Sequence, residues 1–284
     1  MIVITAASGN LGRATAKALQ TKVNPKTVRL AARSTDKLAD FAGQGFDVVK
    51  ADYENAASLR AAFEGAGSVL IISSDGPNEV RAAHHKAAID AAKAAGVKKI
   101  VYTSAINPVS SSRFVWAGAH ETTEATLKAS GVPYVILRDN SYASNNDGFY
   151  AQAKETGTLA LPGAATKVSY VTHEDVAASA AAVLTGAGAI NTIYELTGSE
   201  AFDAHDIANV LSQVTGRTIK AVDLSLADLG GFFTSIGLPP FVVEGLVSFY
   251  AAAAAGEYAA VSGDVQKLTG RPAQSLRDYL RKFA

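Results

Sequence analysis

The chain has 284 residues, 48% of them hydrophobic and 18% charged, and no apolar run of about 18 residues, so it predicts a globular protein rather than a membrane-spanning one. Its 26 basic and 26 acidic residues cancel, and it has no basic stripe, which excludes the charge needed to gather nucleic acid or an anionic membrane. The absence of cysteine excludes disulfides, thiolate metal sites and a cysteine nucleophile, so redox chemistry would need a borrowed cofactor.

The first residues, Met1–Thr5, have the pattern of a buried strand. A secretory signal would instead place a basic segment before an apolar stretch. We therefore expect a cytoplasmic protein whose partner is a small molecule.

Strand-like apolar runs alternate with alanine-rich helical segments through the first half of the chain. The predicted strands are Ile2–Thr5, Val28–Ala32, Phe46–Lys50, Val69–Ile72, Lys99–Ser104 and Tyr134–Leu137. The predicted helices cover about 10–21, 35–43, 56–65, 79–95 and 118–130. Such alternation is typical of βαβ units, so we predict an α/β protein with a doubly wound parallel sheet, the Rossmann fold.

The pattern changes after the sixth strand. A loop rich in Asn, Ser and Tyr covers 139–150 and precedes a largely helical remainder. Within it, short strands are predicted near Ser169–Val171 and Ile193–Leu196, and helices at about 174–185 and 204–215. Thr172 and Asp175 have the spacing of a capping box and predict the start of the first of these helices.

A turn of small residues joins the first strand to the first helix. It consists of Ala6, Ala7, Ser8, Gly9, Asn10, Leu11 and Gly12. A helix start presents free N–H groups and a positive dipole end, so the pyrophosphate of a dinucleotide could bind there. Gly9 would allow its close approach, and Gly12 would let the helix pack on the strand beneath. Ala6 stands at the first position of the G-x-x-G-x-x-G spacing, and a turn without a ligand remains the alternative.

The residue after the second strand indicates which dinucleotide would bind. Arg33 lies 21 residues beyond Gly12, where an acidic residue would bind the ribose 2′-hydroxyl of NAD. An arginine at this position accommodates a 2′-phosphate, so we predict NADP(H) as the cofactor. The alternative for Arg33 is an ordinary exposed charge.

The next two strands also end in polar residues. Asp52 and Tyr53 follow the third strand, where the carboxylate would either bind the adenine amino group or cap the next helix. Ser73 and Ser74 follow the fourth strand and are expected to line the nicotinamide half of the site, because ligands of this fold bind at the carboxyl ends of the strands.

In this order the motifs resemble those of the NmrA-like atypical short-chain dehydrogenases, most closely the quinone oxidoreductases of type 2 and the triphenylmethane reductases. The resemblance covers essentially the whole chain and rests on Thr5–Gly12, Ala32-Arg33, Asp52-Tyr53, Ala91–Ser104, His120-x-x-Thr123-Glu124, Leu137-Arg138 with Tyr142, and Leu268–Pro272. It implies NADPH binding and reduction of quinones or similar conjugated acceptors, without flavin or metal.

Two positions depart from the pattern, since Ala6 and Asp139 stand where relatives usually have Gly and Asn. We also predict that Thr103 and Ser104, at the end of the segment Ala91–Ser104, and Asn140, between Arg138 and Tyr142, belong to the cofactor site.

The usual catalytic pair of this class of enzyme is not at its expected position in the chain. Ordinary short-chain dehydrogenases carry Tyr-x-x-x-Lys on the helix between strands five and six, whereas the only such pair here, Tyr150 and Lys154, follows strand six and is predicted not to be catalytic. The expected helix carries His120 and Glu124 instead, at i and i+4 on one face. His120 is a candidate proton donor, with orientation of a loop as the alternative.

Aromatic side chains near the expected entrance could stack on a flat acceptor. They are Phe114, Trp116, Tyr142, Phe149 and Tyr150. Tyr142 is our choice among them, because it follows a strand end.

We therefore predict an NADP-binding Rossmann domain in residues 1–138 and a smaller substrate-binding region in residues 139–284, partly interleaved with the sheet. The predicted function is an NADPH-dependent reductase of quinones or related aromatic electrophiles, acting as a monomer or homodimer. An NADP-sensing regulator without turnover is the main alternative, because the Tyr-Lys pair is missing. An isomerase that holds NADP tightly is disfavoured for the same reason.

Overall fold

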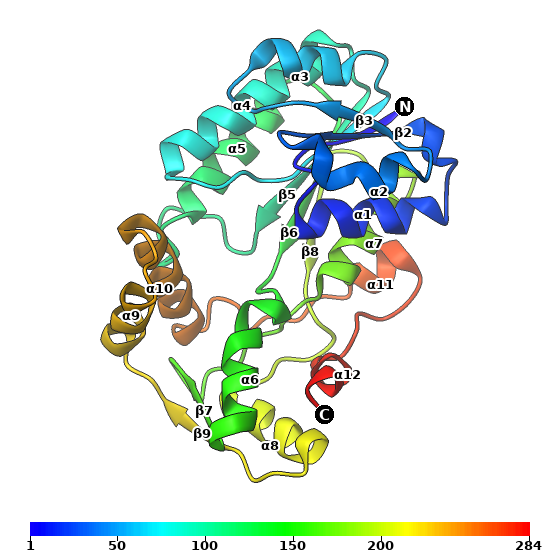
Figure 1. Cartoon of the computed structure of the whole chain (residues 1–284). Coiled ribbons are helices and arrows are strands. Elements are labelled where there is room, and N and C mark those ends of the chain that lie inside the picture. The colour runs from blue at the N-terminus through cyan, green and yellow to red at the C-terminus, as the bar shows by residue number, and fades with distance from the viewer.

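The computed structural model describes all 284 residues. A parallel sheet of seven strands, in the order β3-β2-β1-β4-β5-β6-β8, forms its centre (Figure 1). The strands are β1 (Ile2–Ile4), β2 (Val28–Ala32), β3 (Asp47–Lys50), β4 (Ser68–Ile71), β5 (Lys99–Ala105), β6 (Tyr134–Asp139) and β8 (Thr192–Leu196). The predicted doubly wound sheet is therefore confirmed.

Helices cover both faces of this sheet. One layer contains α1 (Asn10–Gln20), α2 (Ala39–Ala42), α7 (His173–Leu184) and α11 (Asp264–Thr269), and the other contains α3 (Ala56–Phe63), α4 (Asn78–Ala94) and α5 (Ala117–Ala129) (Figure 1). The strands between these layers are apolar on both faces, as parallel strands covered on both sides must be. All four residues of β4, for example, are buried.

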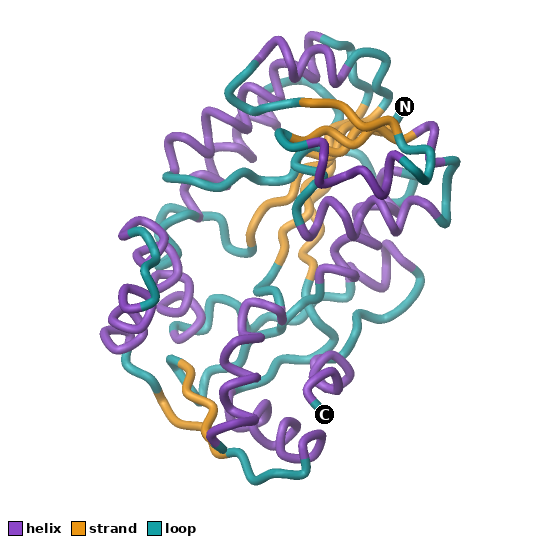
Figure 2. Tube along the Cα trace, in the orientation of Figure 1, coloured by secondary structure: helices purple, strands orange, loops and turns teal.

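The C-terminal half adds a second, smaller body at the carboxyl ends of the strands (Figure 1). Its helices are α6 (Asp147–Thr156), α8 (Ala204–Thr215), α9 (Leu226–Ser235), α10 (Pro240–Ala254) and α12 (Leu276–Leu280). Two short strands, β7 (Thr158–Leu161) and β9 (Lys220–Asp223), pair in parallel and stand apart from the main sheet, as Figure 2 shows. A separate cluster of 24 buried hydrophobic residues holds this body together. None of the helices is both long and apolar enough to cross a membrane.

The predicted elements agree with the structure in the first half and less well in the second. The strand predicted near Ile193–Leu196 is β8, which extends the main sheet from six strands to seven. The strand predicted near Ser169–Val171 was wrong, because this segment makes only isolated bridges, including Val171 with Tyr142. The β7–β9 pair was not predicted.

The capped helix start is confirmed in α7. Thr172 is its N-cap, and the Thr172 hydroxyl accepts a hydrogen bond of 3.1 Å from the Asp175 N–H. Asp175 is fully buried and forms an ion pair of 2.7 Å with Arg271. This ion pair holds the segment after α11 against α7. The main sheet and its helices therefore include residues from near the end of the chain.

Candidate functional site

A cleft of about 580 Å³ lies between the carboxyl ends of the strands and the C-terminal body. Its size suits a small-molecule site. The predicted site residues that line it are Ala6, Gly9, Asn10, Leu11, Gly12, Ser73, Thr103, Ser104, His120, Asn140 and Tyr142. Those outside its lining are Ala7, Ser8, Arg33, Asp52, Tyr53 and Ser74.

Ala6 makes the turn between β1 and α1 in a strained conformation. Its φ is +47°, in the left-handed region that favours glycine. The Ala6 carbonyl accepts a hydrogen bond of 3.0 Å from the Gly9 N–H, which closes the turn. Ala6 replaces the first glycine of the G-x-x-G-x-x-G spacing, and the backbone conformation at this position favours glycine.

Gly12 allows α1 to pack closely on the chain that leaves β1. A Cβ at Gly12 would lie 2.6 Å from the Ala7 Cα and 2.8 Å from the Ala6 carbonyl oxygen, which is too close for any side chain. No side chain caps α1, and the N–H groups of Asn10, Leu11 and Gly12 have no acceptor in the protein. The result is a cradle of free amides at a helix start, which suits an anion.

Arg33 and Asp52 follow neighbouring strands, β2 and β3, which pair in parallel. Arg33 is exposed, and its side chain makes no hydrogen bond or ion pair. The N-cap of α3 is Asn55, whose side chain accepts from the Ser58 N–H. Helix capping by Asp52 was therefore wrong, and contact of its carboxylate with adenine stays a prediction.

Tyr53 connects three strand ends. Its hydroxyl lies 2.6 Å from Thr5 Oγ1 and 2.6 Å from the Ile72 carbonyl oxygen. Burial raises the pKa of Tyr53, with the Thr5 hydrogen bond opposing the shift. Because the hydroxyl is used within the protein, only the ring is free to contact a ligand.

The other predicted cofactor residues are largely bonded to the protein. The Thr103 hydroxyl accepts from the Ser73 N–H at 3.1 Å, and the Ser104 hydroxyl donates to Glu124 at 2.8 Å. The Asn140 amide donates to the Ser169 hydroxyl at 2.7 Å and to the Tyr258 carbonyl at 3.1 Å. The two contacts of Asn140 join the end of β6 to the C-terminal body.

His120 lies in the cleft with both ring nitrogens occupied. Its Nε2 is 3.1 Å from Nη2 of Arg81, and its Nδ1 is 2.8 Å from the Tyr102 hydroxyl. A guanidinium can only donate, so Nε2 is the acceptor and Nδ1 carries the hydrogen. Burial, followed by the nearby charge of Arg81, holds the pKa of His120 well below its usual range. A neutral His120 ring whose two nitrogens are both hydrogen-bonded is better suited to hold Arg81 in place than to donate a proton to a substrate.

Glu124 shares the buried face of α5 with His120 but has a different environment. It binds Arg138 through two hydrogen bonds of 2.9 and 2.8 Å. Burial raises the pKa of Glu124, but the hydrogen bonds from Arg138 and Ser104 outweigh it and lower the pKa. Glu124 is thus an ionised structural partner.

Tyr150 and Lys154 do not form a catalytic pair. Tyr150 is fully buried in the C-terminal body, and its hydroxyl accepts from Asn146 at 3.3 Å. Lys154 is bonded to the carbonyl of Ala284. Neither lines the cleft, so the prediction that this motif is not catalytic agrees with the geometry.

Asp139, which is buried, and Tyr142, which is half-buried, form a pair at the end of β6. The Tyr142 hydroxyl donates to Oδ2 of Asp139 at 2.7 Å, and the Tyr142 ring stacks on His173 at 4.0 Å. Oδ1 of Asp139 is buried and has no partner. Burial raises the pKa of Asp139 to about 8, although the Tyr142 hydrogen bond opposes this shift. Asp139 was not among the site residues predicted from the sequence, although it stands where relatives usually have Asn.

Aromatic side chains line the side of the cleft formed by α10 and the loop before α5. We call Phe114, Trp116 and Phe249 the aromatic wall. The Phe114 ring lies 5.8 Å from each of the other two rings. Of the five aromatics predicted at the entrance, all but Tyr150 line the cleft.

The aromatic wall depends on a glycine in α10. A Cβ at Gly245 would lie 2.1 Å from the Trp116 ring, so only glycine lets α10 pack on that ring. This contact was not predicted, because nothing near Gly245 in the sequence indicates its distant neighbour.

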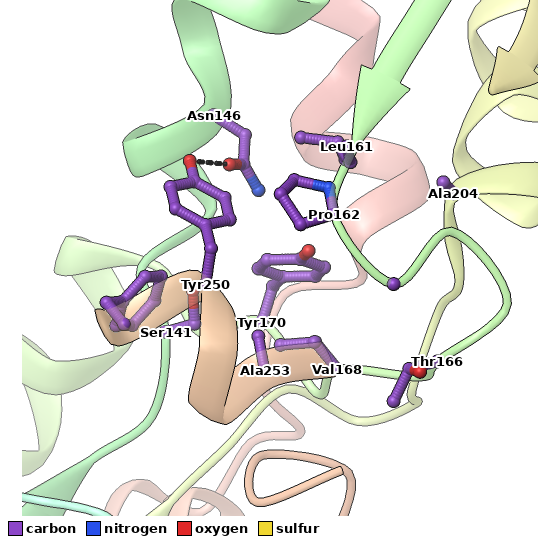
Figure 3. A pocket seen from close by; sticks show the side chains of 12 residues that line it. Ser141, Asn146, Leu161, Pro162, Thr166, Val168, Tyr170, Ala204, Tyr250 and Ala253 are labelled. Carbon is purple, nitrogen blue, oxygen red and sulfur yellow. Dashed lines mark hydrogen bonds between the residues drawn. The ribbon is translucent and has the colours of Figure 1, made fainter. Parts of the chain in front are cut away.

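A second, small cavity lies behind the cleft. Its volume is about 20 Å³, enough for one water molecule, and Ser141 and Tyr250 line both spaces. The Tyr250 hydroxyl donates to Oδ1 of Asn146 at 2.7 Å, and Figure 3 draws this bond beside the cavity. This cavity is too small for a substrate, and the cleft is the candidate site because most of the predicted site residues line it.

The chain is similar to known proteins over its whole length. The model of the NmrA-like family matches residues 1–276. Quinone oxidoreductase 2 of Escherichia coli (strain K12) is 34% identical over 278 residues, which cover 98% of this chain and 96% of that protein.

Two solved structures are similarly close. The NADPH-dependent quinone oxidoreductase of Escherichia coli, complexed with NADPH, has a TM-score of 0.93 at 33% identity and covers 99% of both chains. The Citrobacter sp. triphenylmethane reductase complexed with NADP(H) has a TM-score of 0.92 at 28% identity and covers 100% of both.

Proposed function

This chain belongs to the NmrA-like family, and from that premise we propose that it is an NADPH-dependent oxidoreductase that transfers a hydride to a quinone or a similar conjugated electrophile. One observation carries the proposal. The same cleft holds a cradle of free helix amides and, across from it, the aromatic wall. A dinucleotide and a flat acceptor therefore both find suitable surfaces there.

The residues of the turn fit a dinucleotide. The free N–H groups of Asn10 and Leu11 would bind the pyrophosphate, and Gly9 leaves room for its approach. Arg33, exposed and without a partner, would bind the 2′-phosphate. Asp139 lines the cleft, and its Oδ1 has no partner in the protein.

The bound cofactor would supply the hydride, and the protein would supply position and a proton. The aromatic wall would hold the acceptor flat and exclude water from it. Asp139 holds a proton near neutral pH, because burial raises its pKa to about 8. Asp139 is thus a candidate to protonate the oxygen of the reduced acceptor, the role predicted for His120 from the sequence.

The remaining alternatives are less well supported. The comparisons favour an oxidoreductase over an NADP-sensing regulator, since the similar proteins described above are reductases. We further propose that the protein acts on small molecules without binding nucleic acid, which its zero formal net charge supports. We also propose that it is a monomer or homodimer.

The test is the oxidation of NADPH, followed by its absorbance, with 2-methyl-1,4-naphthoquinone and with a triphenylmethane dye. We expect turnover with NADPH and much weaker turnover with NADH. Tight NADPH binding without turnover of any acceptor in a broad panel would instead favour the regulator.

A further inference from the structure

Arg81 is a buried cation in the wall of the cleft. It lies in the first turn of α4, its residue is only 6% exposed, and it lines the cleft. Its guanidinium lies 5.3 Å from the centre of the Trp116 ring. Arg81 is therefore placed beside the aromatic wall, where a flat acceptor would lie.

No carboxylate pairs with this guanidinium. Its Nη2 contacts only neutral groups, the Ser73 hydroxyl at 3.4 Å and Nε2 of His120 at 3.1 Å. Its Nε is buried without any partner. The acidic residue that bears on it most is Asp75, which is exposed and forms no ion pair with it.

A buried guanidinium without a counter-ion lowers the stability of the fold unless a ligand pairs with it. Burial lowers the pKa of Arg81, but a guanidinium stays cationic at physiological pH. A buried charge without a counter-ion destabilises a fold, and an unpaired N–H group adds to the cost. An anion bound in the cleft would supply the missing counter-charge and an acceptor for the unbonded Nη1.

We propose that Arg81 binds an anionic substituent of the electron acceptor, a carboxylate, sulfonate or phosphate, so that the preferred substrates are conjugated ring compounds bearing a negative charge. This inference rests on the proposed function. Nη1 of Arg81 makes no hydrogen bond within the protein, so it can donate to an oxygen of such a group.

The cofactor is the other possible source of anionic oxygens, and the structure favours the acceptor. The expected partners of the cofactor phosphates are the amides of Asn10 and Leu11 and the side chain of Arg33. Arg81 instead stacks on Trp116. An anion attached to a ring stacked on the aromatic wall would meet Arg81 directly.

The kinetic test compares 1,4-naphthoquinone-2-sulfonate with neutral 2-methyl-1,4-naphthoquinone. We expect Arg81→Met to raise the KM of the sulfonate, divided by that of the neutral quinone, by roughly tenfold to a hundredfold, the effect of a charge-assisted hydrogen bond. Arg81→Lys should recover part of the loss. Arg113→Met, which removes an exposed arginine from the loop before α5, should leave the ratio unchanged.

A binding test needs no turnover. Trp116 is the only tryptophan, so its fluorescence reports on ligands beside Arg81. Benzoate should change the emission of the wild-type protein with and without NADP⁺, whereas benzamide, its neutral counterpart, should not. Arg81→Met should abolish the benzoate response while circular dichroism shows a folded protein.

Two results would overturn the inference. One is an equal response of the wild type to benzoate and benzamide, which needs no variant to observe. The other is a loss of NADPH affinity in Arg81→Met as large as the loss for the sulfonate, which would assign Arg81 to the cofactor. If the wild type reduces no quinone but binds benzoate selectively, the proposed function fails and the anion site stands.

Discussion

The hydroxyl of Tyr142 donates to one oxygen of the Asp139 carboxyl group at 2.7 Å, while the other oxygen is buried without a partner. Burial raises the pKa of Asp139 to about 8 in the folded protein. In the unfolded chain the pKa of an aspartate is about 3.9. Between these values only the folded state keeps the proton.

The pH dependence of stability follows from this difference. The folded state binds more protons than the unfolded state between about pH 4 and pH 8, so this group lowers the free energy of unfolding as the pH rises through that range. Asp139→Asn keeps an acceptor for Tyr142 and removes the titration. We expect the variant to gain on the order of 5 kcal/mol over the wild type at pH 8 and little at pH 4. Urea unfolding across pH 4 to 9 measures the gain, and a difference that does not vary with pH would contradict the assignment.

Arg33 is predicted to select NADPH over NADH. Arg33→Asp should raise the Kd of NADPH roughly tenfold to a hundredfold, because it removes a charge-assisted contact to the 2′-phosphate. The Kd of NADH should change much less. Titrations followed by nicotinamide fluorescence measure both constants, with Arg60→Asp as the exposed-arginine control. A wild type that prefers NADH, or an equal loss for both cofactors, would refute the role of Arg33.

The two glycines of the turn should respond differently to substitution. A Cβ at Gly9 would meet its nearest atom at an ordinary 3.4 Å, so Gly9→Val should fold but lose cofactor binding. Gly12→Ala would clash with the backbone and should cost about 1–3 kcal/mol of stability. Thermal unfolding by circular dichroism, beside an NADPH titration, separates the two effects. Normal NADPH binding by Gly9→Val would show that the phosphates bind elsewhere.

Ala6→Gly should be neutral or stabilising. It relieves the left-handed φ of +47°, although the unfolded chain gains flexibility, so we expect a change between zero and about +1 kcal/mol. Ala14→Gly, in the interior of α1, is the matched control and should cost about 1 kcal/mol. Urea unfolding of both variants gives the comparison. A similar loss in each would mean that Ala6 is not strained.

Tyr150→Phe and Lys154→Ala should each keep the quinone reduction rate within several-fold of the wild type. Their side chains lie outside the cleft, bonded to Asn146 and Ala284. Loss of a true general acid would instead lower the rate by roughly 10²–10⁴-fold. Steady-state rates from pH 5 to 9 decide the question, and a thousandfold loss in Tyr150→Phe with unchanged NADPH affinity would identify it as catalytic after all.

The sequence was sufficient for the features that depend on local pattern. A strand covered on both faces must be apolar along its length, so runs such as Val28–Ala32 identified the parallel sheet. The spacing of Gly9, Gly12 and Arg33 identified a candidate dinucleotide turn, because these positions are fixed by the strand-turn-helix unit itself. Short strands such as β7 escaped prediction, since their few residues show no clear alternation.

Only the tertiary structure decided the electrostatic character of the cleft. Arg81 lacks a counter-ion because folding surrounds it with Ser73 from the end of β4 and with His120 and Trp116 from the α5 region. Asp139 keeps its proton because folding buries it beside Tyr142. Charge and protonation depend on which groups become neighbours and how far water is excluded from them, and neither is fixed by the order of residues along the chain.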